Sequence, residues 1–591
     1  MTVETQGAGD DRPAPRSRLL DVLPVMLLGA LVVSIAYARG RSGAPGGTAL
    51  YWCGQALVVL PAAWRVLAPA TALCERLGLL TGSAAIQSLV TWCYSPDQFR
   101  FPDELQHLRT AGDVLRTGHL FTPSSTLPVS PGFPGLEVVS TALQNLTGLS
   151  IFHAGVLTAS VAHTVLPVCV FLLLRELIRS PRVAAVGALV YGTSPHYAFF
   201  GTLYAYGTIA LPFLVLTLRA AVRARPRSWS VAWIAPPFAA ALVSHHLTTL
   251  VTLGVLAALT GAALLSSSDF RRGVRLLLGT VLTTVAAVAW TAAAAPATFS
   301  YLATPITDVL GGFTGSTGPS PQSLSRTAPL WESVVSLAGA AATSVLILYG
   351  VVRLWRSNVS RTVLAFGLLG LAYPATLVVR VVVPHGAELA ARALTYVMLL
   401  AAFPAAVALA RWWNGRGPRR AVAAFGVVVL LSAGAITAGL PPSWARLPGT
   451  YHVASFQSGV DGHVEAVGRW AARRLPPGQQ AACDFSVCSI VGAYARANLS
   501  SAASEMFYAP SIESTRAQLA RLNLDYVFLD RRMSLEVPIN GQYMFRDVQE
   551  GRHTRPYDPA LFRKFDEDQR IDRVYDNGPI QAYFVRRTWN G

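Results

Sequence analysis

The sequence has few charged residues: Asp, Glu, Lys and Arg make up only 13% of its 591 residues. An ordinary soluble domain carries roughly a quarter, so this composition excludes a soluble globule. Cysteine is also scarce, at 6 residues, which excludes a disulfide-rich scaffold. Apolar residues reach 52%, which excludes intrinsic disorder. The composition therefore indicates a polytopic membrane protein.

Apolar windows long enough to cross a bilayer core, about 20 residues each, recur along the first 440 residues. We predict an α-helical polytopic membrane protein with about 13 transmembrane helices and a C-terminal extracytoplasmic α/β domain. The windows cover residues 19–38, 48–67, 77–94, 151–174, 183–200, 203–218, 231–246, 247–265, 274–293, 331–352, 363–383, 389–410 and 421–440. The stretch 135–149 is shorter and more polar, and is expected to be amphipathic or re-entrant.

Arginine clusters orient these spans, because basic short loops stay in the cytoplasm. The net charge of +17 lies almost entirely in the apolar part of the chain, where it indicates membrane topology and not a nucleic-acid partner. The clusters alternate along the chain, and two of them require a reversal near residues 244–249. Arg39 and Arg41 alone violate the pattern. We expect a cell-membrane protein with a cytoplasmic N-terminus and an extracytoplasmic C-terminal domain.

Three regions follow from this topology: a cytoplasmic tail (1–18), a transmembrane domain (19–440) with two large outer loops at 95–134 and 294–330, and a C-terminal domain (441–591). In the C-terminal domain, helical patterns at 459–475, 489–497 and 511–522 alternate with strand patterns at 480–485, 525–529 and 580–585. This alternation predicts a layered α/β fold. Cys483 and Cys488 are close enough in sequence to bridge, although the pattern leaves their pairing open.

The first outer loop holds the strongest catalytic candidates. Asp103, Glu104 and His107 follow Pro102 at the start of a predicted helix, and Asp103 and His107 share one face. A carboxylate there could take a proton from an acceptor hydroxyl as a general base. The alternative is that Asp103 caps the helix and that Glu104 and His107 are solvated.

This Asp-Glu pair, followed by Pro131-Gly132-Phe133-Pro134-Gly135, resembles the GT-C superfamily of membrane glycosyltransferases, such as protein O-mannosyltransferases and aminoarabinose transferases. The resemblance implies a polyprenyl-phosphate sugar donor, Asp103 as base, and Glu104 as its partner or a metal ligand. The acidic loop of this family normally follows the first span, whereas here it follows the third. Two additional N-terminal spans are therefore expected.

Ionisable residues at the outer ends of predicted spans form a second group of candidates, since such residues are costly in a membrane. His245 and His246 could bind a phosphate or, less readily, a metal, or could simply face the lipid headgroups. Arg380 and Arg392 are predicted to clamp the lipid phosphate, because a guanidinium matches phosphate oxygens. The alternative for Arg392 is an intrahelical ion pair with Glu388.

The remaining candidates are assigned to substrate binding: His107, Tyr204, His385 and Glu388. Tyr204 belongs to an aromatic-rich hairpin that could equally form an interfacial belt.

The leading hypothesis is an inverting glycosyltransferase that moves a sugar from a polyprenyl-phosphate donor to an extracytoplasmic acceptor. Besides donor and acceptor, the bilayer is the expected partner; no cofactor is certain, and a divalent metal stays open. The alternatives are a lipid or sugar transporter or flippase, and a non-catalytic subunit of an envelope assembly complex. No internal repeat favours the transporter.

Overall fold

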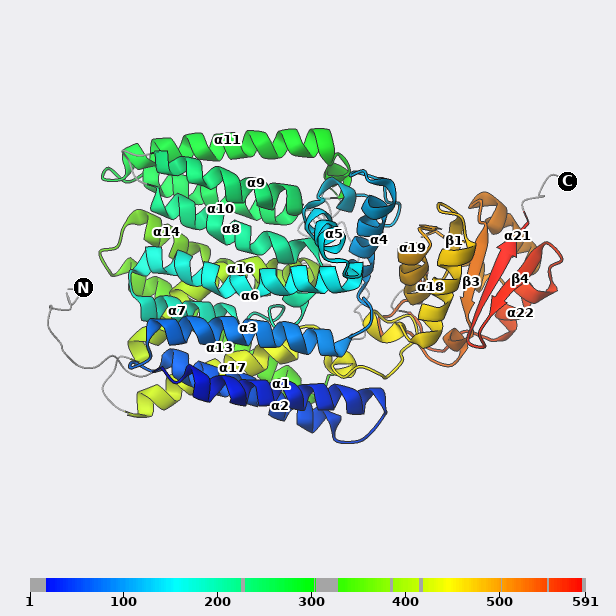
Figure 1. Cartoon of the computed structure of the whole chain (residues 1–591), viewed down its shortest axis with the longest axis horizontal. Helices are drawn as coiled ribbons and strands as arrows, with labels where there is room; N and C mark the ends of the chain where they lie inside the picture. The colour runs from blue at the N-terminus through cyan, green and yellow to red at the C-terminus, as the bar shows by residue number, and fades with distance from the viewer. Residues whose placement is uncertain are drawn as a thin grey trace.

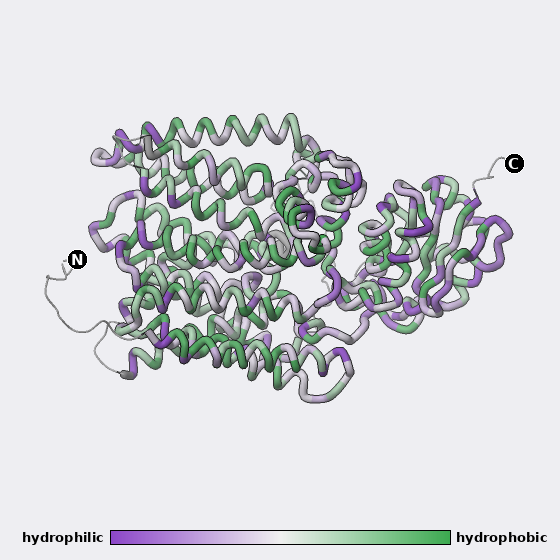
Figure 2. The backbone as a smooth tube through the Cα atoms, in the orientation of Figure 1, coloured by the Kyte–Doolittle hydropathy of each residue, from purple (hydrophilic) through white to green (hydrophobic). Residues whose placement is uncertain are grey.

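A computed structural model describes residues 17–224, 229–301, 303, 328–382, 386–413, 418–500, 502–549 and 552–586. A long bundle of parallel and antiparallel helices carries a smaller domain with a β-sheet at one end, and α1 (Leu19–Arg41) begins at the opposite end, here called the tail end (Figure 1). Apolar residues dominate the bundle helices, whereas hydrophilic residues gather at the two ends of the bundle and in the smaller domain (Figure 2).

Within the described ranges, ten helical segments are long and apolar enough to cross a membrane, so the chain is a multi-pass membrane protein. They are α1 (Leu19–Arg41), α2 (Gly47–Leu67), α6 (Ile151–Ile178), α8 (Tyr206–Arg223), α10 (His246–Leu264), α11 (Phe270–Ala294), α13 (Leu330–Trp355), the pair α14 (Arg361–Leu369) and α15 (Ala372–Val382), α16 (Gly386–Trp413) and α17 (Pro418–Ala438).

The predicted count of thirteen spans is not confirmed, although every predicted window contains helix. The three windows that fall short contain α3 (Leu73–Tyr94), α7 (Pro181–Tyr191) and α9 (Ala235–Ser244). Helix α3 has 22 residues but is not apolar enough to be counted as a span, and α7 and α9 have only 11 and 10 residues. All three nevertheless lie within the bundle (Figure 1).

The predicted reversal between two arginine clusters is found at His245. This residue has extended backbone angles, φ −159° and ψ 122°, and separates α9 from α10. Most of the second predicted outer loop, 294–330, lies outside the described residues. Residues 1–16 of the predicted cytoplasmic tail also lie outside them.

Arginines close the helix ends at the tail end of the bundle. The Arg76 guanidinium donates to the carbonyls of Val66 and Ala68, where α2 ends, and Arg65 pairs with Glu75 at 2.6 Å. Arg41, which violates the charge rule, lies at the other end and donates to the carbonyls of Cys93 and Tyr94 at the end of α3. Since those carbonyls lack helical partners, Arg41 has a local structural role that explains its position.

Two short helices cover the end of the bundle next to the smaller domain. Helix α4 (Pro102–Thr117) lies within the first outer loop, and α5 (Gly135–Thr147) is the segment predicted to be amphipathic or re-entrant. In Figure 1, α5 is seen almost end-on, so it runs across the bundle and not along it. It buries Glu137, Ser140 and Thr141 together with Leu136 and exposes Val138 and Val139, so its polar side chains face the protein and the predicted amphipathic or re-entrant character stays a prediction.

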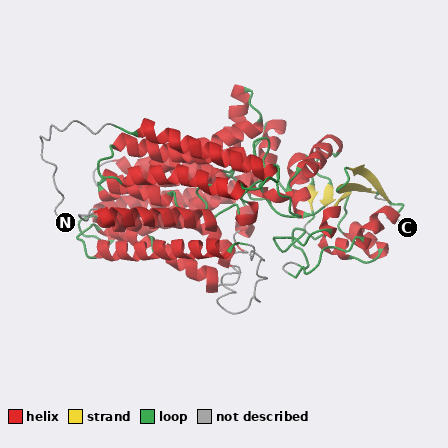
Figure 3. Cartoon of the chain, turned by 90° about the horizontal axis from the view of Figure 1, so that it is seen from below, coloured by secondary structure: helices red, strands yellow, loops and turns green. Residues whose placement is uncertain are grey.

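The C-terminal domain is a five-stranded mixed sheet with strand order β2-β1-β3-β5-β4. Strands β1 (Gln480–Ala482), β2 (Asn498–Leu499) and β3 (Tyr526–Asp530) are parallel, and β5 (Ile580–Val585) pairs antiparallel with β3 and β4 (Ile571–Asp576). Its helices are α18 (Gly462–Arg474), α19 (Phe485–Tyr494), α20 (Ser504–Tyr508), α21 (Ile512–Arg521) and α22 (Ala560–Glu567). Figure 3 shows the strands at the end of the molecule away from the N-terminus.

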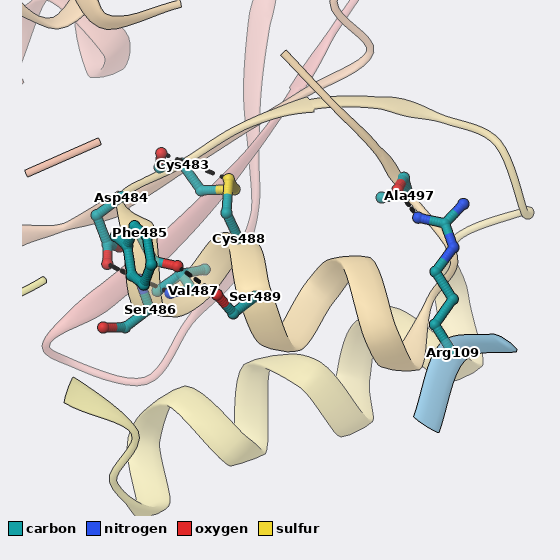
Figure 4. The surroundings of a disulfide bond; sticks show 9 residues. All are labelled: Arg109, Cys483, Asp484, Phe485, Ser486, Val487, Cys488, Ser489 and Ala497. Atoms are coloured by element: carbon teal, nitrogen blue, oxygen red, sulfur yellow. Dashed lines mark hydrogen bonds between the residues drawn. A yellow bond between two sulfur atoms is a disulfide. The ribbon is translucent and has the colours of Figure 1, made fainter. Parts of the chain in front are cut away.

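Two features hold this domain together. Cys483 and Cys488 form a disulfide at the start of α19, where the Asp484 carboxylate accepts from two backbone N–H groups as the N-cap (Figure 4). Lys564 is the only lysine of the chain and is 5% exposed. Its ammonium donates to the carbonyls of Met506, Phe507 and Ala509, which end α20.

Candidate functional site

The two adjacent carboxylates at the start of α4 have different surroundings. Glu104 is the third residue of the helix, and its Oε2 accepts from the backbone N–H groups of Arg100 and Phe101 at 3.3 Å each. Its Oε1 accepts from the backbone N–H of Tyr204 at 3.2 Å. Glu104 therefore closes the start of α4 and joins it to the segment before α8. The alternative that Asp103 is the cap and Glu104 is solvated is wrong, because the third helical position aims its side chain back at the free N–H groups.

Asp103 is exposed, and its side chain makes no hydrogen bond or ion pair within the described part of the chain. Glu104 is 6% exposed, and burial raises the pKa of its carboxyl to about 7. The hydrogen bonds from three backbone N–H groups favour the ionised form and lower the pKa, but the effect of burial is larger. Of the two, Asp103 is the one that an acceptor hydroxyl can reach.

His107 is fully buried and is not solvated as the alternative interpretation expected. Its Nδ1 lies 2.7 Å from Oε1 of Glu137 on α5, and its Nε2 lies 3.4 Å from the backbone nitrogen of Tyr206. Since that N–H donates to Nε2, the imidazole proton is placed on Nδ1 and donates to Glu137. The other carboxylate oxygen of Glu137 has no partner in the described structure. This buried pair fixes α4 against α5 and so fixes the position of Asp103.

Tyr204 is 1% exposed, with its ring stacked on Phe99 at 4.8 Å and its hydroxyl 2.6 Å from the Ser140 hydroxyl. The structure gives it a packing role between α5 and α8. Sugar binding by Tyr204 stays a prediction.

A row of rings leads from His107 to α16. Tyr206 lies 4.5 Å from the His107 ring and 4.2 Å from the His245 ring, and His246 follows at 4.9 Å from His245. His246 lies 5.3 Å from the ring of Tyr301, whose hydroxyl accepts from the Arg392 guanidinium at 2.8 Å. The structure therefore brings α4, α8, α10 and α16 together at one end of the bundle.

The two histidines of the predicted phosphate site are not equivalent. Nδ1 of His245 lies 2.8 Å from the Thr248 hydroxyl and 3.2 Å from the Tyr396 hydroxyl, so this nitrogen is occupied inside the bundle. Nδ1 of His246 is buried and has no partner among the described residues. His246 is therefore the better candidate to meet a ligand.

Of the predicted phosphate clamp, Arg392 is exposed near the start of α16 and Arg380 is exposed in the last turn of α15. Arg392 lies at the α16 end of the row of rings, through its hydrogen bond with Tyr301. His385 and the side chain of Glu388 lie outside the described residues, so the alternative ion pair of Arg392 with Glu388 stays a prediction.

The residues that sequence reasoning missed are Glu137, Thr248, Tyr301 and Tyr396. Glu137 had a signal: it is the only acidic residue of the apolar stretch 135–149. Thr248 is only three residues from His245, whereas Tyr301 and Tyr396 contribute hydroxyl groups from distant parts of the chain that no local pattern connects to the site.

A divalent metal was left open by the sequence. Within the described ranges, no three His, Cys, Asp or Glu side chains converge in a way that could hold a metal ion. Glu104, the predicted metal ligand, already binds three backbone N–H groups. The donor set among the described residues does not fit a metal centre.

The C-terminal domain contacts the far half of α4. The Arg496 guanidinium pairs with Asp113 at 2.6 Å and donates to the Gly112 carbonyl. In return, Arg109 of α4 donates to the Ala497 carbonyl at 2.9 Å, close to the disulfide-bearing helix α19 (Figure 4). One helix thus carries Asp103 at its start and the domain contact at its end.

No family model matches the chain, and no curated protein is similar to it in sequence. Solved structures are similar in fold. The Archaeoglobus fulgidus oligosaccharyltransferase, in a complex with Zn and sulfate, is 13% identical, with a TM-score of 0.50 over 77% of this chain and 68% of that chain. The Archaeoglobus fulgidus enzyme AglB, in complex with an inhibitory peptide and a dolichol-phosphate, is 12% identical, with a TM-score of 0.51 over 77% and 69%. ArnT from Cupriavidus metallidurans, bound to undecaprenyl phosphate, is 13% identical, with a TM-score of 0.48 over 85% and 97%.

Proposed function

We propose that this chain, which has the GT-C fold of membrane glycosyltransferases as its sequence predicted, transfers a sugar from a polyprenyl-phosphate donor to an extracytoplasmic acceptor. One observation carries the proposal: a row of ring contacts joins α4, which has the exposed carboxylate of Asp103 at its start, to the exposed guanidinium of Arg392 on α16. A base and an anion-binding group in one place are what this transfer needs.

Arg392 would bind the donor phosphate. Its guanidinium is held by the Tyr301 hydroxyl at 2.8 Å, and His246 next to Tyr301 offers a nitrogen without a partner. The complex of AglB, whose fold is similar to that of this chain, with a dolichol-phosphate supports this class of donor. Arg380, in the last turn of α15, would attract the phosphate by its charge. His245 would contact the phosphate less readily than His246, because its Nδ1 already meets the Thr248 and Tyr396 hydroxyls.

Asp103 would act as the general base. The acceptor hydroxyl attacks the anomeric carbon while Asp103 takes its proton, and the bond from that carbon to the phosphate oxygen breaks with both electrons leaving on the oxygen. Attack from the side opposite the phosphate inverts the anomeric centre. Arg392 stabilises the phosphate as its charge grows, which is the usual electrostatic contribution to such a step.

Glu104 and the His107–Glu137 pair would be positioning residues. Glu104 holds the start of α4 through backbone N–H groups, and the buried pair holds α4 against α5. The C-terminal domain would hold the other end of α4 through Arg496 and Asp113. A disulfide in that domain is supporting evidence for an extracytoplasmic location, since disulfides persist in oxidising compartments.

The test is incubation of the purified chain in vesicles with defined polyprenyl-phosphate sugars. Release of polyprenyl phosphate together with sugar transfer to an added acceptor mixture is expected. A flippase, the second candidate from the sequence, would move the intact lipid across the bilayer without breaking the sugar–phosphate bond. Transport of uncleaved donor without any release would overturn the glycosyltransferase proposal.

A further inference from the structure

A groove of about 360 Å³ runs along the surface of the bundle between α3 and α6. We propose that this groove binds the hydrocarbon chain of a lipid acceptor, separate from the donor lipid. The inference rests on the proposed glycosyltransferase function, and it names the chemical class of the acceptor as a lipid of the membrane leaflet on the side of the active site.

The depth of the groove matches one leaflet. On α6 its lining runs from residue 156 to residue 165, and on α3 from residue 85 to residue 92. At 1.5 Å per residue the longer side is about 14 Å, roughly half of a bilayer core of about 30 Å. The groove reaches Trp92 and Val156, close to where α3 ends at Tyr94 and α6 begins at Ile151. It therefore occupies the half of the bundle that lies next to α4.

Small side chains make the hollow. Ala85 and Ser88 on α3 face Ser160 on α6, between the larger Leu89 and Leu157. The groove is lined mainly by apolar atoms and is open along its length. A surface of this kind at membrane depth fits a single hydrocarbon chain, which fills it without leaving polar groups unpaired.

The groove continues into a small cavity of about 30 Å³ beside Glu104 and Tyr204. Ser88, Trp92, Val156 and Ser160 line both spaces. The cavity is large enough for about one or two water molecules, so it can receive a hydroxyl group or a bridging water but no bulky headgroup.

Two polar atoms in this cavity have no partner in the described structure: Nε2 of Gln98 and Oγ of Ser88. Both side chains are 5% exposed. A buried donor without a partner costs about 1–3 kcal/mol, so these atoms are expected to meet a polar group that the protein does not supply. The oxygen atoms at the polar end of a lipid, directly or through a water, meet that need.

The position of the cavity separates this lipid from the donor. Glu104 lines the cavity, and the neighbouring Asp103 is exposed at the start of the same helix. The proposed phosphate site is on α10 and α16, which do not line the groove. In Figure 1, α3 and α6 lie at the front of the bundle below α4. A lipid seated between α3 and α6 would thus bring its polar end to the start of α4, beside Glu104 and one residue from Asp103, from a different face than the donor.

The test is photolabelling of the full chain in phosphatidylglycerol vesicles that contain a trace of phosphatidylglycerol with a diazirine in one acyl chain. Labelled peptides are mapped by mass spectrometry. We expect residues 85–92 and 156–165 to be labelled at least tenfold more than α11, which also faces the membrane.

Ala85→Phe should fill the groove and lower this labelling at least tenfold. Ala286→Phe on α11 is the matched control, because it changes an exposed alanine of another span, and it should leave the groove labelling unchanged.

Even labelling of all membrane-facing helices would mean ordinary surrounding lipid and would overturn the inference. A second arm uses a polyprenyl phosphate with a photoactivatable group in its chain. Labelling of the groove by this probe, rather than of α16, would mean that the groove holds the donor chain, which also overturns the inference.

Labelling needs no turnover, so its outcome is distinct from a failure of the chain to release polyprenyl phosphate. In an active preparation, Ala85→Phe should raise the acceptor KM at least tenfold and leave the donor KM within about twofold.

Discussion

The two ends of the membrane bundle use polar side chains in different ways. At the tail end, Arg65 and Arg76 bind Glu75 and the last carbonyls of α2, so their charges close helix ends. At the end next to the C-terminal domain, Gln98, Glu137 and His246 each have a buried atom without a partner, and Asp103 faces solvent. Satisfied groups stabilise the fold, whereas unsatisfied ones are available to a ligand. The contrast predicts that mutations at the first end lower stability and mutations at the second end lower activity.

The sharpest test of this contrast is Asp103→Asn. A general base contributes about 10²–10⁴-fold, so turnover is expected to fall at least a hundredfold while thermal unfolding stays unchanged, since Asp103 makes no hydrogen bond in the described structure. Asp97→Asn, at another exposed carboxylate of the same loop, is the control and should keep wild-type turnover. Retention of more than about a tenth of the activity by Asp103→Asn would make Asp103 dispensable as a base.

Glu104 departs from the contrast, because it is a structural carboxylate at the active end. Its pKa in the folded protein is about 7, above the ordinary 4.5, so its contribution to stability is fully present below about pH 4.5 and is lost as pH rises through about 7. The shift corresponds to about 3 kcal/mol. The wild type should therefore unfold at a lower temperature at pH 8 than at pH 5, and Glu104→Gln should show a smaller difference. An identical pH dependence in the two proteins would mean that the three N–H groups keep Glu104 ionised.

Arg76→Ala tests the tail end. Loss of the guanidinium leaves the last carbonyls of α2 without a partner, at a cost of about 1–3 kcal/mol. We expect a lower unfolding temperature in vesicles and an unchanged turnover per folded molecule. Arg76→Lys should recover part of the stability. A loss of turnover in protein that is still folded would break the contrast, because it would couple the tail end to the chemistry.

The smallest expected effect is that of Arg392→Lys. An ammonium keeps the charge but cannot offer two parallel donors to a phosphate, so the donor KM should rise about tenfold, or about 1.4 kcal/mol, with little change in kcat. Arg380→Lys, further from the ring cluster, serves as the comparison and should change the donor KM less. If kcat falls and the donor KM stays constant, Arg392 does not bind the donor phosphate.

Local patterns were enough to predict the parts of the fold that depend on nearby residues. Apolar length located the bundle helices, and the arginine clusters located the reversal at His245. The strands β2 and β4 were missed, since β2 has two residues and β4 alternates charged side chains on an exposed face. Their pairing with neighbours, and not their own composition, makes them strands.

The candidate site was predicted as a set of residues but not as an arrangement. The Asp103–Glu104 pair was found from sequence, yet which of the two closes the helix depends on where α4 begins. The hydrogen bond of Arg392 with Tyr301 spans 91 positions, and the pairing of His107 with Glu137 crosses two helices. Contacts of this kind are set by the packing of the bundle, and spacing along the chain carries no information about them.

The single lysine has a practical consequence. Lys564 is almost inaccessible and its ammonium binds three carbonyls, so amine-reactive dyes and cross-linkers will find no exposed lysine side chain on this protein. A lysine introduced by mutation at any chosen surface position would then be the only reactive one. Attaching a fluorophore to one lysine in the C-terminal domain would leave the α-amino group as the one other amine that such a dye can reach, so the protein would suit distance measurements on single molecules without removal of any native residue.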